Sequence, residues 1–333
     1  MYKFREFWEE YGNFMQCSEW AAVKENWRSE YIIVRSSDGQ IKATMLVLIK
    51  KIPLLNISFL YAPRGPVCDL HDEKTLAKVF EGIRKIAEKQ NAFAIKIDPL
   101  IDENDVQAID NLRKLGFSYN KDLKGYGTVQ CRENYLLDID EKTINEVMSG
   151  FKSKCRYNIR LAEKKGVRCG FYGYERIDDF MHLMRDTARR DGFDIRNKEY
   201  FARILKSFNS RARLCMCYLG DMPLSGALMI EYAHTVTYVY GCSSNEYRNY
   251  MPNYLMQYTM IKYACEHNCK LYDFGGVPYY DDPTHKNYGV YKFKTNFEGY
   301  VEVYAGEFNY IFKPMWAKIF GTAWRIRKIL EKR

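Results

Sequence analysis

No stretch of the sequence is apolar over the roughly 18 residues that a membrane-spanning helix requires. The first residues, MYKFREFWEEYG, place charged side chains where a secretory signal peptide has its apolar core. The ten cysteines follow none of the spacings that are typical of a disulfide framework. These absences favour a cytoplasmic protein whose thiols stay reduced.

The sequence also has few residues suited to binding a metal or forming a catalytic triad. The five histidines form no Ser/His or Cys/His pair that the sequence reveals: His71, His182, His234, His267 and His285. Cys215 and Cys217 share one strand face, and Cys265 and Cys269 lie one helical turn apart, but no further ligands converge on either pair. We therefore expect core thiols and no metal site.

Positive charge is abundant and concentrated. The formal net charge is +9 and aromatic residues make up 16% of the chain, which suits a nucleic acid, a nucleotide or an anionic membrane as partner. A helix is predicted from Glu141 to Lys165, and its part from residue 152 to 165 contains one acidic residue, Glu163, and six cations: Lys152, Lys154, Arg156, Arg160, Lys164 and Lys165. Such a row can follow a phosphate backbone, or it can be a solvated helix face.

A second basic segment, Asn309 to Arg333, has helical periodicity. Trp316, Ile319 and Trp324 are among its apolar residues, and lysines and arginines fill much of the rest. We expect a C-terminal helix that packs back on the first domain. The alternative is peripheral contact with an anionic membrane surface.

The two halves of the chain repeat one order of elements. In the first half, a strand that ends at Tyr61 is followed by a corner, a helix and a strand that ends at Asp98. A further strand over 130–137 is predicted to continue the same sheet. In the second half the corresponding strands end at Tyr240 and Asp273. This order is the one used by GNAT-type acyltransferase domains.

The prediction is therefore an α+β protein with two tandem GNAT-like domains and a cleft between them. The first domain covers 1–138 and is rejoined by 307–333, and the second covers 139–306. A GNAT domain binds the pyrophosphate of acyl-CoA on a glycine-rich turn at a helix N-terminus. The matching turn in the second half, 248–253, has no glycine, and the one in the first half, 63–66, has one. The acyl donor is thus expected not to be a CoA thioester.

Two residues of the first half stand at strand ends, where α/β folds place ligands. Arg64 lies in the rigid corner Pro63–Pro66, where it can clamp an anion or bond loop carbonyls. Asp98 ends a predicted strand and is followed by Pro99. Its carboxylate can act on a substrate or cap a helix that begins near Glu103. Lys24 lies one helical turn from Trp20 and is a candidate for binding or for a solvated surface.

The stretch Leu271–Tyr300 organises the second half. A short strand stops at Gly275-Gly276, a polar loop follows, and a helix-like run over 289–296 bears Phe293 and Lys294. This arrangement can aim one ammonium group into a cleft. The alternative is a surface lysine.

Taken together, several motifs resemble those of the FemABX family of peptidoglycan aminoacyltransferases, in its short form without a coiled-coil arm. They span nearly the whole chain in the family's order: Gln16-Cys-Ser-Glu-Trp20, Tyr61-Ala-Pro-Arg-Gly-Pro66, Ile97-Asp-Pro99, the helix ending Ala162-Glu-Lys-Lys-Gly-Val167, Tyr240-Gly-Cys-Ser-Ser244, Pro252-Asn-Tyr254, Asp273-Phe-Gly-Gly-Val277 and Phe293-Lys294. One departure is Cys17, where serine is commoner in the family.

The resemblance implies transfer of an amino acid from aminoacyl-tRNA to the stem-peptide amine of a UDP-linked or lipid-linked peptidoglycan precursor. It implies a monomer with no cofactor beyond the aminoacyl-tRNA co-substrate. The implied roles are catalysis by Lys294 and Asp98, acceptor binding by Lys24, Arg64, Tyr254 and Phe293, and tRNA binding by Lys152, Lys154, Arg156 and Arg160. The alternatives are a protein or lipid acceptor, an acyl-CoA donor, or a nucleic-acid-binding module without chemistry.

Overall fold

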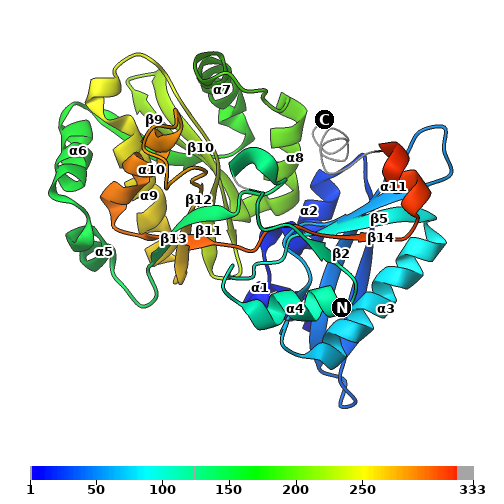
Figure 1. The fold of residues 1–333 in the computed structure, drawn as a ribbon. Coiled ribbons are helices and arrows are strands. Elements are labelled where there is room, and N and C mark those ends of the chain that lie inside the picture. The colour runs from blue at the N-terminus through cyan, green and yellow to red at the C-terminus, as the bar shows by residue number, and fades with distance from the viewer. Residues whose placement is uncertain (1, 124, 321–333) are drawn as a thin grey trace. The chain divides into compact units, whose positions relative to one another are not determined.

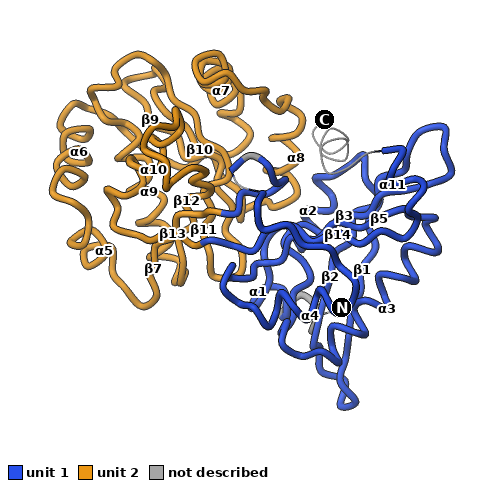
Figure 2. The backbone as a smooth tube through the Cα atoms, viewed as in Figure 1, with its two compact units in different colours: residues 1–132, 303–333 blue, residues 133–302 orange. Residues whose placement is uncertain are grey.

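The computed structural model describes residues 2–123 and 125–320, and Figure 1 shows its ribbon. The chain divides into two compact units, which Figure 2 colours separately. Unit 1 consists of Met1–Arg132 and Val303–Arg333, and unit 2 consists of Glu133–Glu302. Each unit is built on one seven-stranded sheet.

The sheet of unit 1 is mainly antiparallel, with one parallel pair at its centre. Its strand order is β1 (Arg28–Arg35), β2 (Ile41–Lys51), β3 (Ser58–Ala62), β5 (Ala92–Ile97), β14 (Phe308–Ile311) and β6 (Ser118–Tyr119), and β4 (Val67–Cys68) pairs with β2. The parallel pair is β3 and β5, joined by a crossover helix, as GNAT-like domains require. Strand β2 pairs antiparallel with β1, β3 and β4, and β14 pairs antiparallel with β5 and β6.

Helices cover this sheet with amphipathic faces. They are α1 (Tyr2–Tyr11), α2 (Ser18–Val23), α3 (Glu73–Lys89), α4 (Val106–Lys114) and α11 (Pro314–Phe320). On α3 the buried residues recur at helical spacing, as Leu76, Val79, Ile83 and Ile86 show. They pack against the apolar side chains of β2 and β5 and form the core of the unit.

Unit 2 repeats this arrangement. Its strand order is β13 (Tyr300–Val303), β7 (Glu133–Asp138), β12 (Leu271–Gly276), β11 (Thr235–Ser243), β10 (Met222–Tyr232), β9 (Ala212–Leu219) and β8 (Val167–Tyr172). Its helices are α5 (Ile144–Gly150), α6 (Ser153–Lys164), α7 (Ile177–Asp191), α8 (Lys198–Phe208), α9 (Pro252–Glu266) and α10 (Tyr288–Lys294). Here β11 and β12 form the parallel pair, with α9 as the crossover.

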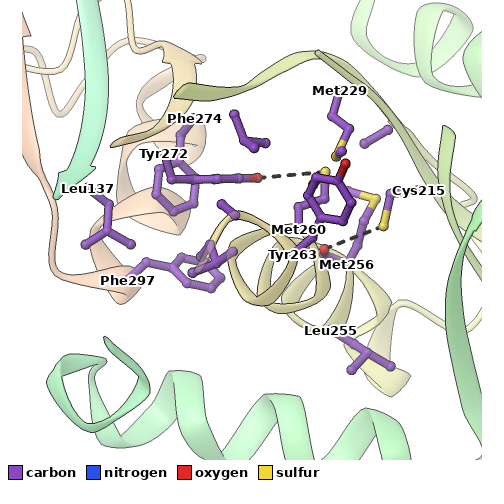
Figure 3. Close-up of a cluster of buried hydrophobic side chains, with 14 of the residues drawn as sticks. Leu137, Cys215, Met229, Leu255, Met256, Met260, Tyr263, Tyr272, Phe274 and Phe297 are labelled. Carbon is purple, nitrogen blue, oxygen red and sulfur yellow. Dashed lines mark hydrogen bonds between the residues drawn. The ribbon is translucent and has the colours of Figure 1, made fainter. Parts of the chain in front are cut away.

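The core of unit 2 is centred on α9. Figure 3 shows Met260 of this helix beside Tyr272 of β12, whose hydroxyl donates to the methionine sulfur, and Leu255, Met256 and Phe274 belong to the same cluster. These side chains are almost completely buried, so α9 is fixed against the sheet over its whole length. The tandem GNAT-like fold predicted from the order of elements is confirmed.

Two strands differ from the prediction, one in the sheet that it joins and the other in the type of secondary structure. The strand predicted over 130–137 does not continue the first sheet; it is β7, which pairs with β12 in the sheet of unit 2. The segment from Asn309 to Ile311 is not helical but forms most of β14, which pairs with β5 in unit 1. Each passage of the chain between the units thus contributes a strand to the sheet that it enters.

The helix predicted from Glu141 to Lys165 is two helices, α5 and α6. Thr143 and Glu146 form a capping box at the start of α5. Phe151 then adopts an extended backbone and buries its ring at 5.1 Å from that of Phe297. Burial of this ring explains the break. The part of the C-terminal helix predicted beyond residue 320 lies outside the described residues.

Two findings limit the classes of site. Among residues 2–123 and 125–320, no helix has both the length and the apolar character needed to cross a membrane. Within the same residues, no three His, Cys, Asp or Glu side chains are grouped so that they could hold a metal ion.

Candidate active site

The predicted site residues are distributed over both units. Unit 1 contains Lys24, Arg64 and Asp98. Unit 2 contains Tyr254, Phe293 and Lys294, together with the four cations of α6 and its cap.

Asp98 follows β5 directly and is almost fully buried, with 1% of its surface exposed. The hydroxyl of Tyr61 donates to its Oδ2 at 2.8 Å, and the backbone N–H of Arg64 donates to its Oδ1 at 2.6 Å. It does not cap the following helix, because Asp105 caps α4 through the N–H of Ala108. The carboxylate therefore connects the ends of the two parallel strands.

The surroundings of Asp98 change its acidity. Burial raises the pKa of its carboxyl group above the ordinary value, and the nearby Arg64 opposes that rise. Burial likewise raises the pKa of Tyr61, which keeps this phenol protonated as a donor. A buried carboxylate with a raised pKa is a stronger base than an exposed one.

Arg64 has positive φ (55°) and is 7% exposed. Its Nη2 donates to the carbonyl of Cys131 at 2.8 Å, and its guanidinium lies 5.3 Å from the ring centroid of Tyr304. This hydrogen bond to a loop carbonyl is the contact expected if Arg64 has a structural role and does not clamp an anion. Its binding of the acceptor stays a prediction.

Gln16 holds the corner that presents Arg64. Its Nε2 donates to the carbonyl of Pro63 at 2.7 Å, and its Oε1 accepts from the N–H of Leu46 at 2.8 Å. A Cβ atom on Gly65 would lie 2.6 Å from the Gln16 side chain. Glycine is therefore required at this position so that the corner can pack on Gln16.

Sequence reasoning missed a buried ion pair in unit 1. Lys96, 1% exposed, donates to the Oε2 atom of Glu307, while Oε1 of the same carboxylate accepts from Val129 N–H at 2.5 Å. Burial lowers the pKa of Lys96 to about 8, and the nearby Asp98 opposes this shift. A single charge within the apolar strand Ala92–Ile97 was the signal that could have identified the pair.

Lys24 terminates α2, and its Nζ lies 4.4 Å from the ring centroid of Trp20. The indole is 4% exposed, so the lysine stem covers a buried aromatic ring. This cation–π contact fixes the position of the ammonium group, as phosphate binding would need.

The glycine corner of unit 2 has an irregular backbone. Gly275 has φ 74°, and its N–H donates to Oδ1 of Asp273 at 2.7 Å. Nδ2 of Asn134 donates to the same carboxylate. A Cβ atom at Gly275 would lie 3.1 Å from the carbonyl oxygen of Tyr238, so both conformation and space favour glycine.

Lys294 ends α10 and is 4% exposed. Its Nζ donates to the carbonyls of Gly275 at 3.0 Å and Gly276 at 2.8 Å. The ammonium group is thus directed at the end of β12, and it is not a solvated surface lysine. A buried cation held in place by backbone carbonyls has the fixed orientation that stabilisation of a developing negative charge requires.

Aromatic rings pack against Phe293, the residue that precedes Lys294 in α10. The rings of Tyr254 and Phe293 meet at 5.0 Å and 71°, and Phe297 lies 5.7 Å from Phe293. Burial raises the pKa of Tyr254, and a hydrogen bond with Asn158 of α6 opposes the shift. The structure therefore brings Tyr254, Phe293 and Lys294 together in unit 2.

The cations of α6 and its cap are not equivalent. Lys154 and Arg160 are exposed, whereas Lys152 pairs with Glu298 at 3.5 Å. Arg156 donates to the carbonyls of Ser149 and Phe151, so it stabilises the junction of α5 and α6. Lys154 and Arg160 remain the better candidates for contact with phosphates.

The two crossover helices differ at their N-termini, where an anion could bind. The side chain of Asp72 accepts from Lys74 N–H and Thr75 N–H at the start of α3. At the start of α9 the first residue is Pro252, which has no N–H. The start of α3 therefore lacks the row of free backbone donors that a pyrophosphate needs, and the start of α9 has one such donor fewer.

Unit 2 has a cavity of about 440 Å³ that lies apart from the candidate site residues. It is lined by residues of the β7–α5 connection and of the end of α9, including Glu141, Glu266 and Cys269. None of the predicted site residues lines it.

Known proteins resemble this chain over most of its length. The model of the FemAB family matches residues 2–221 and 220–325. Curated relatives include the lipid II:glycine glycyltransferases of Staphylococcus haemolyticus (strain JCSC1435), 30% identical over 95% of this chain and 92% of that protein, and of Staphylococcus aureus (strain USA300), 28% identical over 95% and 92%.

Solved structures extend the comparison. The crystal structure of FemX matches with a TM-score of 0.87 and 28% identity, covering 95% of this chain and 96% of that one. A tandem GNAT protein from the clavulanic acid pathway shares the fold, with a TM-score of 0.56, 10% identity, and coverage of 93% and 94%. Because the family model and a 30% identical relative both span most of its length, the chain belongs to the FemAB family.

Proposed function

We propose that this aminoacyltransferase moves an amino acid from an aminoacyl-tRNA to the stem-peptide amine of a peptidoglycan precursor and so builds an interpeptide bridge. The observation that carries the proposal is the set of relatives named lipid II:glycine glycyltransferase, the first of which is 30% identical over 95% of this chain. The FemX structure, 28% identical over nearly the full length, supports the same class of enzyme.

The chemistry is attack of an amine on an activated ester. A lysine-type amine has a reference pKa of about 10.4, so it must lose a proton before or during attack. Asp98 is proposed to receive a hydrogen bond from this amine. Each of its oxygens already accepts one hydrogen bond and retains a second lone pair.

Attack produces a tetrahedral intermediate with a negatively charged oxygen. Lys294 is proposed to stabilise that oxygen, or the tRNA ribose oxygen that leaves as the carbon–oxygen bond breaks. The protonated amine releases one proton to solvent before attack, and the attacking nitrogen loses a second proton as the amide bond forms. This second proton ends on the leaving oxygen, so atoms and charges balance without a covalent enzyme intermediate. The two glycine carbonyls keep the ammonium group oriented throughout.

Lys24, Arg64, Tyr254 and Phe293 are proposed to bind the acceptor. Lys24 is suited to a phosphate because its ammonium group is held over Trp20. Arg64 is proposed to contribute mainly by holding its corner in place, since its guanidinium bonds Cys131.

The donor is proposed to be an aminoacyl-tRNA and not an acyl-CoA. Asp72 closes the N-terminus of α3, and Pro252 removes a donor from that of α9. The exposed Lys154 and Arg160 on α6 offer charges that can contact the tRNA backbone. Lys152 and Arg156 are proposed to support this surface through their contacts with Glu298 and Ser149.

The test mixes the protein with a pool of charged tRNAs and a stem-peptide acceptor, UDP-linked in one arm and lipid-linked in another. Mass spectrometry of the acceptor is expected to show the gain of one amino-acid residue, and its mass identifies that amino acid. Uncharged tRNA is the matched control. No gain in either arm would refute the proposal, and a gain with acetyl-CoA in place of tRNA would favour an acyl-CoA transferase.

A further inference from the structure

One end of unit 1 exposes aliphatic side chains beside lysines. The segment over 50–57, which comprises the end of β2 and the connection to β3, presents Leu54 with 104% relative exposure and Leu55 with 39%. The segment over 311–319 presents Ile311 with 49% and Met315 with 69%. We refer to these two segments together as the apolar end.

The two segments are joined by hydrogen bonds through one residue. Asn91 donates from Nδ2 to the carbonyl of Asn56, and it accepts at Oδ1 from Nζ of Lys313. The loop and the start of α11 are therefore neighbours, and Figure 1 shows α11 beside β5. The exposed side chains belong to one surface.

The helix α11 has one half-buried face and one exposed face. Phe320 stacks on Phe93 of β5 at 5.3 Å and 25°, and Trp316 lies one turn earlier on the same side. Met315 and Ile319, also one turn apart, are both half or more exposed. Helical spacing thus places an aliphatic pair on the side that does not pack on the sheet.

The charges indicate what binds there. Four lysines lie in the two segments, and neither segment contains an aspartate or glutamate: Lys50, Lys51, Lys313 and Lys318. Lysine is depleted in protein–protein interfaces, whereas aliphatic tips flanked by lysines suit a bilayer with anionic headgroups. Leu54 also has φ 64°, an uncommon conformation for leucine, and it presents its whole side chain to the surroundings.

We propose that the apolar end docks on an anionic lipid surface, with Leu54, Leu55 and Met315 entering the headgroup region and the lysines contacting lipid phosphates. The exposed Lys51 and Lys318 supply the charge attraction. Together with the proposed function, this docking would bring the enzyme to a lipid-linked acceptor. The docking itself does not depend on the chemistry, because it is measured without donor or acceptor.

The experiment measures co-sedimentation of the full chain with vesicles of phosphatidylcholine alone or mixed with phosphatidylglycerol. Binding to the mixed vesicles is expected, with a strong decrease as salt is added. The Leu54→Ser/Met315→Ser variant is expected to bind about tenfold or more weakly, because it loses two apolar insertions. Lys51→Ala and Lys318→Ala are each expected to lose roughly fivefold, which corresponds to about 1 kcal/mol per basic residue near the surface.

Matched controls exist on other faces of unit 1. Val106→Ser changes an exposed apolar residue on α4 (65% exposed), and Lys78→Ala changes an exposed lysine on α3. Both should bind as the unchanged protein does, and thermal melts should show that every variant is folded. Equal loss in the controls, wild-type binding by the Leu54/Met315 variant, or no preference for anionic vesicles would each overturn the proposal.

A second readout separates this proposal from the proposed function. Transfer to a soluble, UDP-linked acceptor should be unchanged in the docking variants, because none of the substituted residues belongs to the candidate active site. Vesicle binding without any transfer by the unchanged protein would refute the transfer chemistry and leave the docking surface standing.

Discussion

Replacing Lys294 with methionine tests the assignment of the candidate active site most directly. The substitution keeps the length and apolar character of the stem, and it removes the ammonium group that bonds Gly275 and Gly276 at 3.0 and 2.8 Å. Hydrogen bonds from charged donors contribute about 1.5–3 kcal/mol each. Two such bonds amount to about 3–6 kcal/mol, and removing a buried charge offsets part of this, so we expect a loss of stability of roughly 2–4 kcal/mol.

The effect on turnover should be separate and larger. Loss of one group that stabilises an oxyanion costs about 10²–10³-fold in kcat. Because that interaction is made only in the transition state, kcat and kcat/KM for the acceptor should fall together. The assay is transfer of an amino acid to the stem-peptide acceptor, at a temperature where circular dichroism shows the variant to be folded.

The matched control is Lys292→Met on the same helix, where the lysine is exposed. It should change neither turnover nor stability appreciably. If folded Lys294→Met keeps more than about a tenth of the original kcat, the ammonium group does not stabilise the transition state and serves only to hold the glycine corner.

Three further predictions concern parts of the chain with other roles. Lys96→Met should cost about 3–5 kcal/mol of unfolding free energy by leaving Glu307 buried without its partner, and Lys96→Met/Glu307→Gln should recover most of it in denaturant titrations, since glutamine can still accept from Val129. Arg160→Ala should lower the slope of log tRNA affinity against log salt by about 0.7–0.9, with Lys206→Ala on α8 as the control that leaves it unchanged. A hydrogen bond to an aspartate raises the pKa of His71, so the stability it contributes is present below about pH 6.5 and is lost as pH rises through the raised pKa. His71→Gln should therefore lower Tm more at acidic than at alkaline pH, and an equal effect at both would refute this linkage.

The order of elements was predictable because it depends on local patterns. The strands predicted to end near Tyr61, Asp98 and Asp273 are marked by apolar runs followed by glycine, proline or a charge. The short helix with Phe293 and Lys294 follows from the same kind of signal. Local periodicity therefore sufficed for the tandem fold.

Strand pairing was not predictable in the same way. Both β7 and β14 join sheets built mostly from residues far away in the sequence, and no local pattern specifies the partner of such a strand. The break between α5 and α6 likewise depends on a non-local contact, the burial of Phe151 against Phe297. The sequence pattern around 141–165 is helical on both sides of that break.

The hydrogen bonds of the candidate site residues in each unit were harder to predict. They depend on which backbone groups have no partner in a neighbouring strand. The β11–β12 ladder runs over three residues of each strand and ends at Asp273. Beyond it, Gly275 turns to positive φ, its N–H is taken by Asp273, and its carbonyl accepts from Lys294. The first half has a related device, in which the N–H of Arg64, also at positive φ, is taken by Asp98.

In both repeats, then, a carboxylate near the end of the second parallel strand accepts a hydrogen bond from the N–H of a residue with positive φ and so stabilises its conformation. The two copies differ in where that residue lies: at Arg64 beyond the first parallel strand in unit 1, and at Gly275 within the second in unit 2. Only in unit 2 does this irregularity direct two successive carbonyls at one ammonium group. The repeated fold therefore supplies the strand ends. The different placement of one residue with positive φ accompanies the buried carboxylate of Asp98 beside one parallel pair and the buried ammonium group of Lys294 beside the other.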